Sequence, residues 1–241
     1  MRIFSRVRGL RGLSNKIFLD TNPRILYDSF RGFASIVTPP PNTQIDKALA
    51  LLRQGGLTRL SEFRRAGVTA ATVSRLEKSG AISRLARGLY QLPDAAVGTN
   101  HTLAEASKLV PKGVICLTSA LAFHGLTDQM PARVWVAIGS KDWRPRLKYP
   151  PMRFAHFPLK QLRAGVEHHT VEGASVPIFS VCKTIADVFR YRRTIGIDIA
   201  IEGLREAMRQ RKASPGEIAR YASEGGVWKV MEPYMSALTH G

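Results

Sequence analysis

The chain has 241 residues, of which 44% are hydrophobic, so it can bury one large core or two small ones. Lys and Arg outnumber Asp and Glu by 36 to 18, and the resulting formal charge of +18 favours phosphate polyanions such as nucleic acid as partners. No stretch approaches the roughly 18 consecutive apolar residues of a membrane-spanning helix, so we expect no membrane partner. Cys116 and Cys182 lie in apolar segments without metal-ligand spacing, which predicts buried thiols in a reducing, cytoplasmic location.

The sequence predicts a basic arm followed by two domains. Residues 1–41 carry seven Lys or Arg and two Asp or Glu, lack the apolar run of a secretory signal, and end in three prolines. We expect this segment to be a flexible arm outside the fold. The domains are expected at residues 42–95 and 96–241.

Three helices and a hairpin are predicted in the first of these domains. Apolar spacing and terminal glycines place the helices at residues 43–54, 57–66 and 69–79. Thr58 and Thr69 are the expected N-caps of the second and third helices. Residues 82–92 are expected to form two short strands around a turn at residues 86–88. This order is typical of a winged helix-turn-helix domain.

The third helix has the pattern of a DNA-recognition helix. A helical wheel points Val73 and Leu76 inward and Arg75 and Lys78 outward. The Arg75 guanidinium can pair with guanine, the Lys78 ammonium suits a phosphate, and the helix N-terminus favours an anion. The predicted DNA-binding residues are Thr69, Ala71, Thr72, Ser74, Arg75 and Lys78 of the helix, with Arg84 and Arg87 of the hairpin. A merely solvated polar face is the alternative interpretation.

The second half of the chain predicts a mixture of strands and helices without strict alternation, so the fold class is α+β: an N-terminal winged helix-turn-helix domain followed by a mixed α/β domain. Strands are expected at 113–118, 133–138, 152–158, 166–173 and 176–181. Helices are expected at 102–110, 119–126, 183–196, 198–212, 215–223 and 228–238.

A second basic surface is one interpretation of this half. Residues 140–153 form a proline-rich basic loop, and Lys183 and Asp187 are spaced for an ion pair on the helix that follows. The helix charges could be a surface ion-pair cluster. Alternatively, a surface for RNA, a nucleotide or further DNA would comprise Arg144, Arg146, Lys148, Lys183, Arg190 and Arg193.

No catalytic residue, metal or cofactor is predicted. A nucleotidyltransferase needs paired carboxylates after a Gly-Ser turn to hold its metal ions, and residues 139–143 supply one Asp only. Ser119 and His124 lie about 140° apart on one predicted helix and cannot form a nucleophile and base. His168 and His169 would point to opposite sides of a strand, which argues against joint metal ligation.

Residues 57–93, "LTRLSEFRRAGVTAATVSRLEKSGAISRLARGLYQLP", resemble the winged helix of AbiEi-family antitoxins. Downstream, "LTSALAFHGLTDQMPARVWVAI", "RPRLKYPPMRF" and "CKTIADVFRYRRTIGIDIAIEGLREAM" resemble the C-terminal domain of that family, so the similarity covers about residues 43–239. The resemblance places the family's recognition helix at residues 69–79 and its wing at residues 84–91. The basic arm is a departure, because typical members do not need one.

The resemblance also implies a function. Such a protein binds inverted repeats in double-stranded DNA upstream of its own operon and represses it. Its C-terminal domain counteracts a cognate nucleotidyltransferase toxin without a stable complex, as in type IV toxin-antitoxin systems. Two alternatives stay open: a metal-dependent nucleic-acid-processing enzyme with a winged-helix targeting domain, and a winged-helix regulator unrelated to a toxin.

Overall fold

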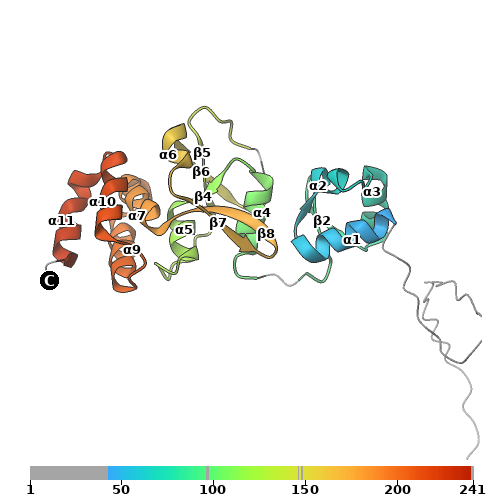
Figure 1. Ribbon diagram of the computed structural model, residues 1–241, viewed down its shortest axis with the longest axis horizontal. Coiled ribbons are helices and arrows are strands. Elements are labelled where there is room, and N and C mark those ends of the chain that lie inside the picture. Colours follow the sequence, from blue (N-terminus) through green and yellow to red (C-terminus); the bar gives the residue numbers. More distant parts are fainter. Residues whose placement is uncertain (1–42, 96–97, 146, 148, 240–241) are drawn as a thin grey trace, which may run out of the picture. The chain divides into compact units, whose positions relative to one another are not determined.

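The computed structural model describes residues 43–95, 98–145, 147 and 149–239 (Figure 1). The predicted arm at residues 1–41, and Arg146 and Lys148 of the predicted basic surface, lie outside the described residues. The described segments mix helices with one three-stranded and one five-stranded sheet, which confirms a mixed α/β structure. Within these segments, no helix is long and apolar enough to cross a membrane.

The N-terminal described segment contains the three predicted helices and the predicted hairpin. Its antiparallel sheet has the order β1-β3-β2. In chain order the elements are α1 (Gln44–Gly55), β1 (Thr58–Arg59), α2 (Leu60–Arg65), α3 (Ala70–Lys78), β2 (Ser83–Ala86) and β3 (Leu89–Gln91). Gly88, with a φ of 74°, forms the hairpin turn in a conformation that side-chain-bearing residues rarely adopt.

The prediction of Thr58 as a helix N-cap is wrong. Thr58 is buried in β1 and pairs with Tyr90 of β3, so the short strand replaces the first turn of the predicted second helix. The helix α2 begins two residues later, and the Arg59 amide donates to Glu62 Oε2 at 2.6 Å. Cross-strand pairing therefore overrides the local capping signal.

A small apolar core lies beneath these elements. Val73 and Leu76 of α3 are buried, as the helical wheel predicted, and the rings of Phe63 and Tyr90 meet edge to face with centroids 6.0 Å apart. Burying a side chain such as Phe63 contributes about 1.5–3 kcal/mol, so this core fixes the orientation of α3. The outward side of α3 is left to solvent.

The second sheet has the strand order β6-β5-β4-β8-β7. Its strands are β4 (Val114–Ile115), β5 (Val134–Gly139), β6 (Met152–Phe157), β7 (Val166–Val171) and β8 (Ala174–Phe179). The pairs β5–β6 and β4–β8 are parallel, whereas β4–β5 and β7–β8 are antiparallel. The strand at one edge of this sheet is therefore β6.

Both faces of this sheet are covered. Every residue of β5 is buried because alternate side chains enter two different clusters. Val134, Val136 and Ile138 pack in a cluster that includes residues of α4 (His101–Leu109). Trp135 and Ala137 pack in a cluster that includes α5 (Leu117–Phe123) and the C-terminal helices.

The C-terminal helices match the predicted ones except at two points. They are α6 (Leu159–Arg163), α7 (Val181–Arg190), α8 (Arg192–Ile195), α9 (Ile197–Arg209), α10 (Pro215–Glu224) and α11 (Trp228–Thr239). The single helix predicted over residues 183–196 is in fact two, because the ψ of 14° at Tyr191 ends α7 before α8 begins. The short helix α6 was not predicted.

Candidate nucleic-acid interface

The outward face of α3 presents most of the residues predicted to bind DNA. The Thr69 hydroxyl accepts a hydrogen bond from the Thr72 amide at 3.3 Å, which confirms Thr69 as the N-cap. The exposed residues of the predicted set on this helix and its cap are Thr69, Ala71, Ser74, Arg75 and Lys78. Small side chains in the first turn leave the backbone amides of that turn close to the surface.

Thr72 does not lie on this face, contrary to the prediction. It is only 2% exposed, and its hydroxyl donates to Gln44 Oε1 at 2.7 Å. The same oxygen accepts from the Thr69 hydroxyl at 3.0 Å and from the Thr69 amide at 3.2 Å. Thr72 therefore anchors α3 to the start of α1, and we remove it from the contact surface. Sequence reasoning missed Gln44, because a contact across 25 residues leaves no local pattern.

The two cations of α3 are not neutralised by a carboxylate of the described residues. The Arg75 guanidinium donates to the Thr72 hydroxyl at 3.3 Å, a neutral partner. Lys78 lies in the last turn and is exposed. Both charges are therefore available to an external anion.

The hairpin adds two exposed cations. Arg84 Nη1 lies 3.9 Å from Glu77 Oε1, at the limit of an ion pair, and its Nε donates to the Ala86 carbonyl at 3.3 Å. Arg87 lies exposed in the turn between β2 and β3. These cations follow α3 directly in the chain, on the sheet that packs against it.

The second basic surface is not assembled as predicted. Lys183 is 4% exposed and its ammonium donates to Asp187, which is 3% exposed. The ammonium also lies 4.6 Å from the centroid of Phe179 and 5.0 Å from that of Phe157. The alternative of a surface ion-pair cluster is wrong for the same reason, since the pair is buried.

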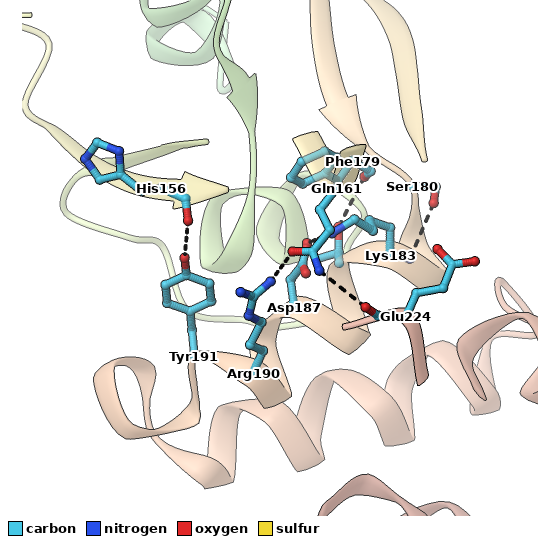
Figure 2. A network of polar contacts seen from close by, with 10 residues as sticks. His156, Gln161, Phe179, Ser180, Lys183, Asp187, Arg190, Tyr191 and Glu224 are labelled. Carbon is cyan, nitrogen blue, oxygen red and sulfur yellow. Dashed lines mark hydrogen bonds and ion pairs between the residues drawn. The ribbon is translucent and has the colours of Figure 1, made fainter. Parts of the chain in front are cut away.

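The other described members of that predicted surface differ in how exposed they are. Arg190 is half-buried, donates to Gln161 Oε1 and lies 5.8 Å from the centroid of Phe157 (Figure 2). Arg144 and Arg193 are exposed. Only these two of the described members are free to form part of a surface.

Figure 2 shows that the buried pair belongs to a network joining β6, α6, α7 and α10. Gln161 Nε2 donates to the Glu224 carbonyl at 3.3 Å, and the Tyr191 hydroxyl donates to the His156 carbonyl at 3.0 Å. Burial raises the pKa of the Asp187 carboxyl, and the Lys183 ammonium offsets this only in part. The network positions helices, and sequence reasoning missed Gln161 because α6 was not expected.

The candidate catalytic and metal-binding side chains are held in structural contacts. Ser119 Oγ accepts from the Trp135 amide at 2.9 Å, and His124 Nε2 donates to the Phe179 carbonyl at 2.8 Å. His168 bonds Ser175, whereas His169 lies against a phenylalanine ring. The described residues contain no group of three or more His, Cys, Asp or Glu side chains placed to hold a metal ion.

The region around α3 thus combines helices with a three-stranded sheet and exposes cations that no described carboxylate neutralises. Residues 46–93 match the family described as "Transcriptional regulator, AbiEi antitoxin", which confirms the resemblance to AbiEi antitoxins over that stretch. Among solved structures, the crystal structure of the RV2827C protein from Mycobacterium tuberculosis is similar. Its TM-score is 0.43 with 12% sequence identity, over 80% of this chain and 80% of that chain. No curated protein matches the sequence.

Proposed function

We propose that this protein is a sequence-specific DNA-binding regulator in which residues 42–95 form a winged helix-turn-helix domain. In this proposal α3 is the recognition helix and the β2–β3 hairpin is the wing. One observation carries it: α3, inside the stretch that matches AbiEi regulators, exposes Ser74, Arg75 and Lys78 without a carboxylate partner among the described residues. Opposite charges three or four residues apart on a helix can pair, and Arg75 and Lys78 have no such ion pair on α3.

The proposed roles follow from side-chain chemistry. The planar guanidinium of Arg75 can make two hydrogen bonds to the O6 and N7 atoms of a guanine in the major groove. Lys78, a compact point charge, is assigned to a backbone phosphate, and Thr69 and Ala71 let phosphate approach the helix N-terminus. Arg84 and Arg87 would reach the backbone or the adjacent minor groove.

We extend the proposal to the operon. The AbiEi match supports a role as antitoxin and transcriptional regulator. In more detail, we propose that the protein binds inverted repeats upstream of its own gene and represses transcription. Residues 96–241 would counteract a nucleotidyltransferase toxin, encoded beside it, without a stable complex. The chain itself is assigned no catalytic activity.

Fluorescence-anisotropy titration tests the DNA-binding proposal. The full chain is titrated with its own upstream duplex and with a scrambled duplex over a series of salt concentrations. We expect binding of the upstream duplex at least about a thousandfold tighter than binding of the scrambled one. The slope of affinity against salt then counts the phosphate contacts. Equal and steeply salt-dependent binding to both duplexes would show that net charge alone provides the affinity.

The antitoxin role has a separate test. The neighbouring open reading frame is expressed with and without this protein, and growth is measured. Rescue by a variant that no longer binds DNA would assign neutralisation to residues 96–241. If the neighbouring frame lacks a nucleotidyltransferase pattern, the antitoxin role loses its support while the regulator role stands.

A further inference from the structure

A hydrogen-bonded turn at the end of β5 is followed by an exposed tryptophan. The Asp142 amide donates to the Gly139 carbonyl at 2.9 Å, and the Gly139 amide donates to Asp142 Oδ2 at 2.9 Å. A Cβ atom at Gly139 would come within 2.7 Å of that carboxylate oxygen, so a larger residue there would displace the Asp142 side chain. Trp143 follows the turn directly and is 82% exposed. An indole so exposed contributes little to the core, and its ring is accessible to a ligand.

An arginine is held next to this tryptophan. Arg144 Nε donates to His156 Nε2 at 3.1 Å. The accepting nitrogen carries no proton, so the other ring nitrogen, Nδ1, is the one that donates to the Gly139 carbonyl at 3.2 Å. The same glycine thus anchors both the turn and the histidine that orients Arg144. The terminal nitrogens of Arg144 have no carboxylate partner among the described residues.

These groups surround a surface hollow of about 520 Å³. Its size lies within the roughly 300–1,000 Å³ of small-ligand sites. One side is the edge strand β6, whose Met152, Phe154 and His156 alternate along the strand and so share a face. The other side is the loop that carries Trp143 and Arg144. The hollow therefore offers an apolar floor, an aromatic face and a guanidinium.

The charge of this part of the chain favours a polyanion. Residues 143–166 contain six Lys or Arg and no Asp or Glu. The nearest carboxylate in the sequence, Asp142, is exposed and lines the hollow, where its Oδ2 accepts from the Gly139 amide. An exposed aromatic ring beside unneutralised cations is the combination that binds single-stranded nucleic acid, because bases stack on the ring while cations follow the backbone.

We propose that this hollow binds an unpaired nucleotide of a single-stranded nucleic acid, with the base stacked on the Trp143 indole and its phosphate on the Arg144 guanidinium. A base inside a duplex has both faces covered by its neighbours, so this site selects single strands. It is separate from the duplex-binding role assigned to α3, and it gives the C-terminal domain a ligand class of its own.

Stacking can be measured directly on the full chain. Oligouridylate and oligothymidylate of equal length are titrated into the wild type, and tryptophan fluorescence and anisotropy of a labelled strand are recorded. We expect quenching of Trp143 fluorescence on binding. The Trp143→Ala variant should bind at least about tenfold more weakly and lose most of the quenching, whereas Trp143→Phe should retain part of the affinity.

One arginine variant tests the proposed phosphate contact, and two others are controls for nonspecific charge and for binding through α3. Arg144→Ala should weaken binding severalfold. Arg193→Ala removes another exposed charge, on α8, and should leave the affinity nearly unchanged. Arg75→Ala should also leave it nearly unchanged, while it impairs duplex binding. Because Trp143 is exposed, thermal unfolding of Trp143→Ala should match that of the wild type.

The outcomes distinguish the ligands. Binding of the RNA or of the DNA strand with loss in Trp143→Ala supports the proposal and identifies the preferred sugar. Equal affinity of wild type and Trp143→Ala overturns it. Loss of strand binding in Arg75→Ala but not in Trp143→Ala would also overturn it, since strands would then bind through α3. If neither strand binds, the proposal is refuted, and a protein becomes the remaining candidate partner for this face.

Discussion

Removing the Asp187 carboxylate should leave a buried positive charge without its ion-pair partner. In the Asp187→Ala variant, the Lys183 ammonium, with 4% of the residue exposed, loses its ion pair and keeps only the faces of Phe157 and Phe179. Breaking a buried pair by removing one partner costs about 3–5 kcal/mol. Contacts between a desolvated cation and aromatic rings are worth about 2 kcal/mol and persist, so we expect a loss near the lower end, about 3 kcal/mol.

Guanidinium denaturation followed by circular dichroism measures this loss. With a denaturant slope of about 5 kcal/mol/M, the midpoint should fall by roughly 0.6 M. The melting temperature should fall by about 6–12 °C for a chain of this size. As a control, Glu206→Ala removes an ion pair to Arg209 at the surface and should barely move the midpoint, because water screens exposed charges.

The double variant Lys183→Met, Asp187→Leu tests whether charge is the cause. Burial raises the pKa of Asp187, and in buried ion pairs the cost of removing both charges from water can exceed their attraction. Replacing both charges with apolar side chains should therefore leave stability within about 1 kcal/mol of the wild type, or increase it. A loss below about 1 kcal/mol in Asp187→Ala would mean that water reaches the pair. Equal losses in the single and double variants would mean that packing, and not charge, is responsible.

Three further predictions follow from the structure. Arg75→Ala should weaken the upstream duplex by about 1–3 kcal/mol and relax base preference, whereas Lys78→Ala should weaken upstream and scrambled duplexes alike; anisotropy titrations giving the same pattern for both variants would contradict these roles. Burial raises the pKa of Cys116 well above its ordinary value and that of Cys182 to about 11, so an aromatic disulfide reagent at neutral pH should label neither thiol until the protein is unfolded. Burial alone would raise the pKa of Glu62, but the hydrogen bond from a backbone amide and the ammonium of a lysine lower it below 4.5. Its ionised form therefore stabilises the fold above that pH and loses this effect as pH falls below it; unfolding free energies of wild type and Glu62→Gln should converge in acid, and parallel curves would argue against the assignment.

The sequence predicted α3 well because its signals are local. Thr69 caps the helix through an amide three residues away, and Gly80 follows its end with a φ of 75°. Val73 and Leu76 are buried as helical spacing requires. These features depend on residues within one or two turns, which a single sequence displays directly.

The errors arose where distant residues decide. β1 exists because Thr58 pairs with Tyr90, and Thr72 is buried because Gln44 lies over it. The spacing of Lys183 and Asp187 predicted their pairing, but not that sheet and helices would cover them. Periodicity indicates which residues share a face and does not identify what packs against that face.

The Trp143 site was missed for a related reason. The loop was recognised from its prolines and cations, but its tryptophan carried no periodic pattern. The orientation of Arg144 comes from its hydrogen bond to His156 of β6, whose ring is in turn held by the Gly139 carbonyl of β5.

Site-directed cleavage of DNA tests the central claim most directly. Because both native thiols are buried, Ser74→Cys introduces an exposed thiol on the outward face of α3, to which an iron chelate can be attached. Ser223→Cys on α10 is the matched control, because Ser223 is also an exposed serine on a helix. Our account predicts that the chelate at position 74 cuts the upstream duplex in narrow clusters at the repeats, and that the chelate at position 223 does not. Equal or dispersed cleavage from the two positions would show that α3 does not read this DNA.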